Sequence, residues 1–184
     1  MARPAERDPA SRGRQALVIQ TARLLIRLPL DEDAQPFLDI HTDPDVIRWL
    51  GGPRPKTLQD ERDRIARGRA MHEELGFTMW TAVEKATGEV VGLAGLFPVE
   101  GGDGAIEVAY HFRKDRWGRG YATEAARACL DYGFSTGRLD RVVGLVHPDN
   151  HASRRVLEKC GMTYEGRGRY YDMDLLIFAL ERPG

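Results

Sequence analysis

One segment constrains the fold of this chain more than any other: residues 105–135 combine a strand, a glycine loop and a long helix. Side chains alternate along 105–112 as in a strand, and apolar positions recur at helical spacing from Tyr121 onward. Gly118 and Gly120 lie in the turn between these elements. The first amides of a helix lack internal partners and carry the positive end of its dipole, and glycines let a phosphate approach them. The segment therefore predicts a pyrophosphate-binding turn.

Basic residues flank this turn and are expected to surround it with positive charge: Arg113, Lys114, Arg116 and Arg119. A tight turn with solvated arginines is the simpler alternative. A Rossmann dinucleotide site fits poorly, because Thr123 stands at the third glycine position of its motif and the strand follows an apparent hairpin. A P-loop is excluded, because no Gly-Lys-Ser/Thr sequence follows. A nucleotide-binding regulatory domain remains an alternative that rests on the glycine loop alone.

Periodicity elsewhere predicts one mixed α/β domain around a single sheet. Besides 105–112, the expected strands are 24–28, 77–84, 89–97, 141–147, 162–165 and 174–180, and the expected shorter helices are 31–41, 43–49, 57–75 and 151–160. Thr57 and Asp60 form a capping-box pattern at the start of 57–75. Residues 1–18 are expected to form a flexible tail, and residues 19–184 a single domain.

The charge balance argues against several classes of partner. The 184 residues include 27 basic and 28 acidic side chains, a formal net charge of -1, whereas non-specific nucleic-acid binding needs a basic excess. No apolar run approaches the ~18 residues that span a bilayer, and residues 1–15 lack the apolar segment of a signal peptide. Two cysteines cannot build a disulfide framework or a four-cysteine zinc site, and the histidines show no metal-ligand spacing. We therefore expect a cytoplasmic protein with no metal, nucleic-acid or membrane partner.

Two sequence blocks resemble motifs of a known family. Residues 117–122, Trp-Gly-Arg-Gly-Tyr-Ala, resemble motif A of the GCN5-related N-acetyltransferases (GNAT superfamily), although Trp117 replaces the usual Gln or Arg. Together with Tyr110, the run WGRGYATEA is similar to the RimJ/RimL-like branch. Residues 150–162 resemble motif B, 164–166 resemble that branch's continuation, and 21–27 resemble its first strand.

The resemblance spans about residues 20–181 and implies the GNAT fold. This fold is an α/β (α+β) domain with a single mixed, mostly antiparallel sheet of about six to seven strands, flanked by helices on both faces. Acetyl-CoA is the implied co-substrate, without a metal. Its pantetheine arm is expected to pair with backbone near His111, Phe112 and Arg113. The residues expected to hold its pyrophosphate are Gly118, Arg119, Gly120, Tyr121, Ala122 and Thr123. Asn150 matches the motif B residue that holds the cofactor arm, and capping the following helix is its alternative role.

The resemblance also implies catalytic residues for direct attack of a neutral amine on a thioester. Glu107 matches a glutamate that some members use as the base, and a surface carboxylate is its alternative role. Many relatives protonate the leaving thiolate with a Tyr that here is replaced by Leu157. Ser153 is the motif B hydroxyl that remains for this task, and a first-turn helix serine is its alternative role.

The acceptor is expected to be a primary amine, either a protein N-terminal α-amine or a small-molecule amine. In the resembling branch, the acceptor is selected by loops that correspond here to about 41–56 and 97–104. A non-catalytic GNAT-fold module that binds acyl-CoA or a protein partner remains the alternative function. Dimers are common in such folds, and a homodimer stays open.

Overall fold

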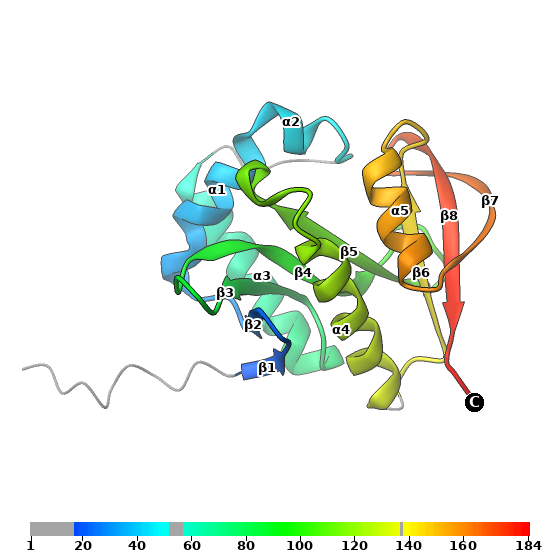
Figure 1. Ribbon diagram of the computed structural model, residues 1–184, viewed down its shortest axis with the longest axis horizontal. Coiled ribbons are helices and arrows are strands. Elements are labelled where there is room, and N and C mark those ends of the chain that lie inside the picture. The colour runs from blue at the N-terminus through cyan, green and yellow to red at the C-terminus, as the bar shows by residue number, and fades with distance from the viewer. Residues whose placement is uncertain (1–16, 52–56, 137) are drawn as a thin grey trace, which may run out of the picture.

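A computed structural model describes residues 17–51, 57–136 and 138–184 and contains one sheet of eight strands (Figure 1). The strand order is β1-β2-β3-β4-β5-β6-β8-β7, and only the β5–β6 pair is parallel. The strands are β1 (Leu17–Gln20), β2 (Leu24–Arg27), β3 (Met79–Glu84), β4 (Val90–Pro98), β5 (Ile106–Phe112), β6 (Arg141–Val146), β7 (Thr163–Tyr170) and β8 (Met173–Glu181). The expected mixed, mostly antiparallel sheet is therefore confirmed, with eight strands where about six to seven were expected, because β1 adds an edge strand.

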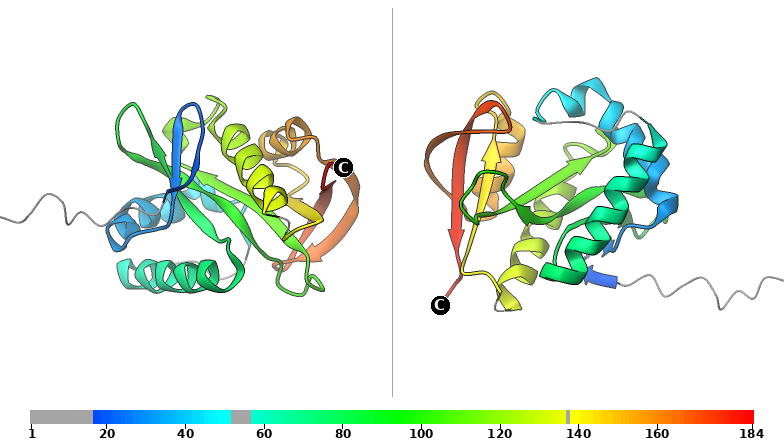
Figure 2. Two further views of the ribbon diagram at one scale, coloured as in Figure 1. Left: turned by 90° about the horizontal axis from the view of Figure 1, so that it is seen from below. Right: turned by 180° about the vertical axis from the view of Figure 1, so that it is seen from behind.

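Helices cover both faces of this sheet, as expected (Figure 2). Helices α1 (Ala34–Thr42) and α3 (Leu58–Leu75) lie on one face, and α4 (Tyr121–Ser135) and α5 (His151–Lys159) on the other. The short α2 (Pro44–Ile47) follows α1 and ends two residues before the predicted Trp49. Two single turns of 3₁₀-helix, at Asp31–Asp33 and Lys114–Arg116, precede α1 and the glycine loop.

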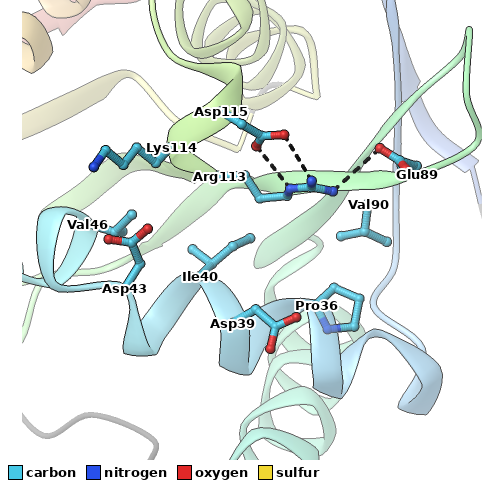
Figure 3. A pocket seen from close by; sticks show the side chains of 10 residues that line it. All are labelled: Pro36, Asp39, Ile40, Asp43, Val46, Glu89, Val90, Arg113, Lys114 and Asp115. Atoms are coloured by element: carbon cyan, nitrogen blue, oxygen red, sulfur yellow. Dashed lines mark hydrogen bonds and ion pairs between the residues drawn. The ribbon is translucent and has the colours of Figure 1, made fainter.

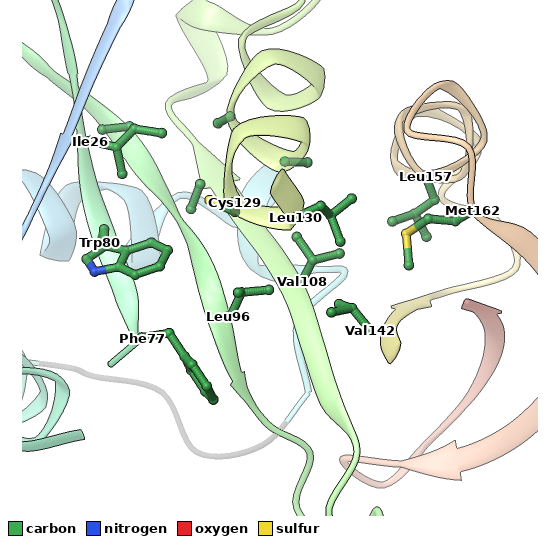
Figure 4. Close-up of a cluster of buried hydrophobic side chains, with 14 of the residues drawn as sticks. Ile26, Phe77, Trp80, Leu96, Val108, Cys129, Leu130, Val142, Leu157 and Met162 are labelled. Atoms are coloured by element: carbon green, nitrogen blue, oxygen red, sulfur yellow. The ribbon is translucent and has the colours of Figure 1, made fainter. Parts of the chain in front are cut away.

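The main hydrophobic core fills the space between the sheet and helices α4 and α5 (Figure 4). Trp80, Leu96 and Phe178 are among its fully buried side chains, and Leu130 and Cys129 contribute from α4. Burying an aromatic or aliphatic side chain of this size stabilises the fold by about 1.5–3 kcal/mol. A second, smaller core lies under α1 and α3 on the opposite face. The two cores hold the sheet rigid between helix layers, and this rigidity positions the site described below.

A buried ion pair fixes the start of α1 against the sheet. The guanidinium of Arg27 donates two hydrogen bonds, of 2.6 and 2.7 Å, to the carboxylate of Asp33. Thr81 on β3 donates a third bond to the same carboxylate. Such a bidentate pair is strong and directional, so it sets the direction in which α1 leaves the sheet. The end of α1, where His41 lies, is thereby held in a defined place.

The sheet opens between β5 and β6. These two strands share a single paired position, Glu107 with Val143, and then diverge (Figure 1). All other neighbouring strands pair over several residues. The divergence leaves the rest of this edge of β5 without a neighbouring strand, so its backbone groups are available to a ligand.

We expect Gly95→Ala to destabilise the fold. Gly95 lies in β4, and a Cβ added there would collide with the backbone carbonyl oxygen of Thr78. Overpacking against backbone typically costs about 1–3 kcal/mol. Chemical denaturation should show this loss in the free energy of unfolding. Gly184→Ala, where nothing lies within 4 Å, is the matched control, and equal stability of the two variants would contradict the packing argument.

Candidate active site

A cleft of about 880 Å³ runs through the opening between β5 and β6. It reaches both faces of the sheet, because alternate residues of β5 line it from opposite sides. Glu107, Ala109 and His111 face the α1/α3 side, whereas Val108 and Phe112 pack in the core under α4. Most of the predicted site residues line this one cleft: Glu107, His111, Phe112, Gly118, Gly120, Tyr121, Ala122, Thr123, Asn150 and Ser153. Arg113 and Arg119 do not line it.

The glycine loop presents the start of α4 to this cleft. Gly118 and Gly120 adopt φ values of +72° and +82°, a left-handed conformation that glycine adopts without strain. Gly120 is the N-cap of α4, and no side chain caps that helix end. The first-turn amides of Tyr121, Ala122 and Thr123 therefore lack intrahelical partners. An uncapped helix start that lines a cleft fits a bound diphosphate, because the amides donate and the dipole favours negative charge.

The predicted ring of positive charge is mostly neutralised. The Arg113 side chain pairs with Asp115 and Glu89 in a separate cavity of about 820 Å³ against α1 (Figure 3). Lys114 pairs with Asp45 at 2.5 Å, and Arg116 pairs with Glu89 at 2.8 Å.

Among the described residues, Arg119 is the one basic residue of this group without an ion pair. The backbone amides are therefore the main source of positive potential at this turn.

Arg23 supports the turn and was not identified from the sequence. Its Nη1 donates to the carbonyl oxygen of Arg119 at 2.8 Å, and its Nε pairs with Glu124 at 2.7 Å. Its guanidinium also lies 4.4 Å from the centre of the Tyr121 ring. Arg23 thus connects the β1–β2 turn to the first turn of α4. No spacing in the sequence could indicate this contact, because about a hundred residues separate the partners.

The backbone groups at the open edge of β5 overlap with the predicted ones only at Phe112. The Arg113 amide donates to Val91 on β4 at 3.0 Å, so it is not free for a ligand. Bonded pairs alternate along an antiparallel ladder, so His111 also directs its backbone toward β4, whereas Tyr110 and Phe112 direct theirs toward the opening. The Phe112 carbonyl already accepts a bond from Trp117 Nε1 at 2.8 Å. This leaves the backbone of Tyr110 and the Phe112 amide at the opening.

Glu107 is a buried carboxyl group rather than a surface one, with 6 % of its surface exposed. The Tyr171 hydroxyl donates to its Oε2 at 3.0 Å. Burial raises the pKa of Glu107 to about 8, although the bonds from Tyr171 and the Leu145 backbone favour the charged form. Tyr171 lies in the β7–β8 turn at φ +52° and was not predicted, because nothing local in the sequence connects that turn to β5.

Ser153 lies at the start of α5. Its hydroxyl is 2.9 Å from that of Tyr110, a residue that the sequence placed in a motif but not in the site. Burial raises the pKa of Tyr110 above its ordinary value, so its hydroxyl stays protonated at neutral pH. Asn150 accepts a bond from the Ser153 amide at 3.1 Å and is thus the N-cap of α5, while it also lines the cleft. Leu157 is buried against Gly144 and offers no hydroxyl.

The segment after α2 lines the cleft and approaches Tyr171, the partner of Glu107. The Trp49 ring lies 5.5 Å from that of His147, and a Cβ on Gly51 would contact the Tyr171 backbone. Residues of both predicted acceptor loops, 48–51 together with Phe97 and Glu100, line this part of the cleft. Residues 52–56 of the first loop lie outside the described residues.

Two general features of the described residues bear on ligands. No group of three His, Cys, Asp or Glu side chains within 17–51, 57–136 and 138–184 could hold a metal ion. No helix in that part of the chain combines the length and apolar character needed to cross a membrane.

Comparison with known proteins gives consistent results. Residues 23–163 match the family described as the acetyltransferase (GNAT) domain. The chain is 35% identical to the uncharacterized protein YkkB of Bacillus subtilis (strain 168) over 160 residues, which cover 86% of this chain and 92% of that one. It superposes on a GNAT-family acetyltransferase from Bacillus anthracis with a TM-score of 0.76 and 26% identity, covering 89% of this chain and 98% of that one.

RimL, a ribosomal L7/L12 alpha-N-protein acetyltransferase solved in complex with coenzyme A, also has a TM-score of 0.76. That superposition covers 90% of this chain and 97% of RimL. Its sequence identity of 17% makes it a likeness of fold.

Proposed function

The chain belongs to the acetyltransferase (GNAT) family, and we propose that it transfers the acetyl group of acetyl-CoA directly to a primary amine, either a protein N-terminal α-amine or a small-molecule amine. One observation carries the proposal: the cleft passes through the sheet, with an uncapped helix start on one face and a buried carboxyl group on the other. A donor and an acceptor can therefore approach the same point from opposite faces in a ternary complex.

The residues on the α4/α5 face fit the donor. The amides of Tyr121, Ala122 and Thr123 would hold its pyrophosphate, because they are donors at the positive end of a helix. The backbone of Tyr110 and the Phe112 amide would pair with the amide groups of the pantetheine arm, much as a neighbouring strand would. Acetyl-CoA supplies the activated thioester, and these groups fix its position relative to Glu107.

On the opposite face, Glu107 is the proposed base. An alkylamine has an ordinary pKa near ~10.4 and is mostly protonated at neutral pH, so attack requires loss of a proton. A carboxylate whose pKa is raised to about 8 accepts that proton more readily than an ordinary glutamate does. The approaching ammonium also favours the charged form of Glu107. The hydrogen bond from Tyr171 keeps the carboxyl group oriented toward the cleft.

The hydroxyls of Tyr110 and Ser153 are the proposed donors to the leaving thiolate. A thiol with a pKa near ~8.5 leaves as a fairly stable anion, so a hydrogen bond or a weak acid suffices. The two hydroxyls are bonded to each other, and either can donate onward. They take the place of the usual motif B tyrosine, which is Leu157 here. A non-catalytic acyl-CoA-binding module stays the alternative, because that usual acid is absent.

A direct test combines binding with turnover. Differential scanning fluorimetry with acetyl-CoA, CoA, ATP and NAD should show a shift in melting temperature for the two coenzyme A compounds alone. Incubation with acetyl-CoA and a panel of amines and peptides, read by mass spectrometry, should show transfer of one acetyl group. Binding without transfer to any acceptor favours the non-catalytic module, and stabilisation by ATP or NAD alone favours the nucleotide-binding alternative.

Ser153→Ala and Tyr110→Phe are each expected to lower kcat by about 10- to 100-fold, because general-acid assistance to a good leaving group contributes modestly. Since the hydroxyls act as a unit, the double variant should lose little more than the worse single variant. Steady-state kinetics measures both effects. Tyr132→Phe is the matched control, since its hydroxyl bonds Gly76 and does not line the cleft. If the loss of kcat in the double variant equalled the product of the two single losses, the hydroxyls would act independently, which would contradict their coupling.

A further inference from the structure

A buried chain of side chains ends in the cleft on the same face as Glu107. His41 Nδ1 lies 2.6 Å from Glu61 Oε1, and His41 Nε2 lies 3.1 Å from His111 Nδ1. Glu61 is fully buried and His41 is 4% exposed, whereas His111 is only partly buried and lines the cleft. Arg64 lies beside this chain and also lines the cleft. The proposed reaction uses none of these side chains.

The proton positions in this chain follow from its partners. Burial opposes the charge on Glu61, but the His41 bond and Arg64 outweigh it and lower the pKa of Glu61, which is therefore an acceptor only. His41 Nδ1 must then donate. Burial lowers the pKa of His41, so the ring is neutral and its Nε2 accepts. His111 Nδ1 must donate to that acceptor, and because burial lowers the pKa of His111 well below its ordinary value, its Nε2 carries a lone pair.

That lone pair has no protein partner among the described residues. Among the described residues, the His111 side chain makes one hydrogen bond, from Nδ1 to His41 Nε2. Its Nε2 has no partner there, yet it is not one of the buried atoms that lack a partner. Its Nε2 is therefore open to the cleft. The ligand that it fits must be a hydrogen-bond donor.

His111 is a poor candidate for a second base. Its pKa is lowered far from that of an amine, whereas the pKa of Glu107 is raised toward it. Ala109 lies between the two residues on the same face of β5, and its small side chain leaves the cleft open between them. Four residues of strand span roughly 13 Å, so both ends can contact one extended acceptor.

We propose that His111 selects acceptor amines that carry a hydroxyl group, which donates a hydrogen bond to its Nε2 while the amine lies at Glu107. A carboxylate could not donate this bond, and a second ammonium would approach the positive charge of Arg64. A hydroxyl can donate to His111 and accept from Arg64, whose Nε already bonds Glu61 at 3.1 Å. His41 and Glu61 are then positioning residues that lock the tautomer of His111. The inference rests on the proposed acetyl transfer.

The test uses matched amines with acetyl-CoA and the whole protein. Amino alcohols from aminoethanol to aminohexanol are compared with alkylamines in which methyl replaces hydroxyl, and with methyl ethers, which only accept hydrogen bonds. We expect kcat/KM for the best amino alcohol to exceed that of its alkylamine and its ether by about 10- to 100-fold. Equal rates within every set overturn the inference and leave the proposed function intact. Failure to bind acetyl-CoA, or to acetylate any amine, counts against the proposed function itself.

Two variants test the role of the histidine chain. His111→Phe should reduce the hydroxyl preference to about one, whereas His72→Phe on α3, outside the cleft, should preserve it. In Glu61→Gln, the amide oxygen accepts from Arg64 Nε, so its NH₂ faces His41 Nδ1 and favours the reversed tautomers of both histidines, against the Arg64 Nη2 donor that lies 3.5 Å from His41 Nε2. His111 Nε2 then becomes a hydrogen-bond donor, to which an ether oxygen can also bond. The methyl ether should therefore be acetylated with the same kcat/KM as the alcohol. Glu73→Gln, exposed on the same helix, is the control for this variant.

A measurement independent of turnover keeps the test decisive if Glu61→Gln unfolds. The imidazole ¹⁵N shifts of the wild-type protein should show His111 protonated at Nδ1 and unprotonated at Nε2 at neutral pH. A proton on Nε2 of the wild-type His111 overturns the inference, as does an unchanged hydroxyl preference in folded His111→Phe.

Discussion

Gly120→Glu is expected to abolish binding of coenzyme A, with an increase in Kd of at least about 100-fold. Gly120 is the N-cap of α4 with φ +82°, so a side chain there is strained by about 1–2 kcal/mol. The larger effect is electrostatic, because the carboxylate lies at the positive end of the helix and takes the place of a phosphate. Isothermal titration calorimetry with CoA measures the loss.

Two further variants separate charge from backbone strain. Gly120→Ala carries the strain without the charge and should weaken CoA binding far less than the glutamate does. Gly88→Glu adds the same charge at φ +73° in the β3–β4 turn, where nothing lies within 4 Å, and should leave CoA binding unchanged. Micromolar affinity for CoA in a folded Gly120→Glu protein would refute the phosphate site.

Elements with local signals were predictable. The capping box of Thr57 and Asp60 marks the start of α3 as expected, and Gly161 adopts φ +83° just after α5. The buried face of α4, which includes Cys129, follows from the helical spacing of apolar residues from Tyr121 onward. Each of these signals depends on contacts within one element or on its one buried face. Such information is present in a short stretch of sequence.

Edge strands were the least predictable parts of the fold. β1 was assigned partly to the tail, and β7 extends to Tyr170 instead of ending at Glu165. Most of β7 is exposed or half-buried, and it pairs on one side with β8 alone. A strand with little buried surface has no strong apolar alternation to reveal it.

The features of the site also divide into those that local sequence predicts and those that depend on distant contacts. Alternation along 105–112 places Glu107 and His111 on one face of the strand, and both line the cleft. The charges around the glycine loop were misjudged, because Glu89 and Asp45 approach them from distant elements. Sequence spacing also could not bring His41 and Glu61 to His111, since these contacts require the packing of α1 and α3 on the sheet.

Glu107→Gln is expected to lower kcat by about 100- to 10,000-fold, the range of general base catalysis. The amide has nearly the same shape and can still accept a bond from Tyr171, so the loss reflects proton transfer rather than misfolding. In the wild type, kcat/KM should rise with pH and level off above a pKa of about 8, because the carboxylate form is the active base. The variant should lose this rise. Steady-state rates from pH 6 to pH 10, measured in the same buffers, check both results.

The pH dependence of stability is a second test of the raised Glu107 pKa, and its expected direction is opposite to that of activity. The pKa of Glu107 is higher in the folded protein than in the unfolded chain, so between about pH 4.5 and 8 the folded state binds the extra proton. Wild-type stability should therefore fall across this range, by as much as roughly 5 kcal/mol, while Glu107→Gln lacks that contribution. The variant should thus be less active yet more stable than the wild type at pH 8 and above. Glu158→Gln, exposed on α5, should change neither property, and a Glu107→Gln protein with normal rates would exclude this carboxylate as the base.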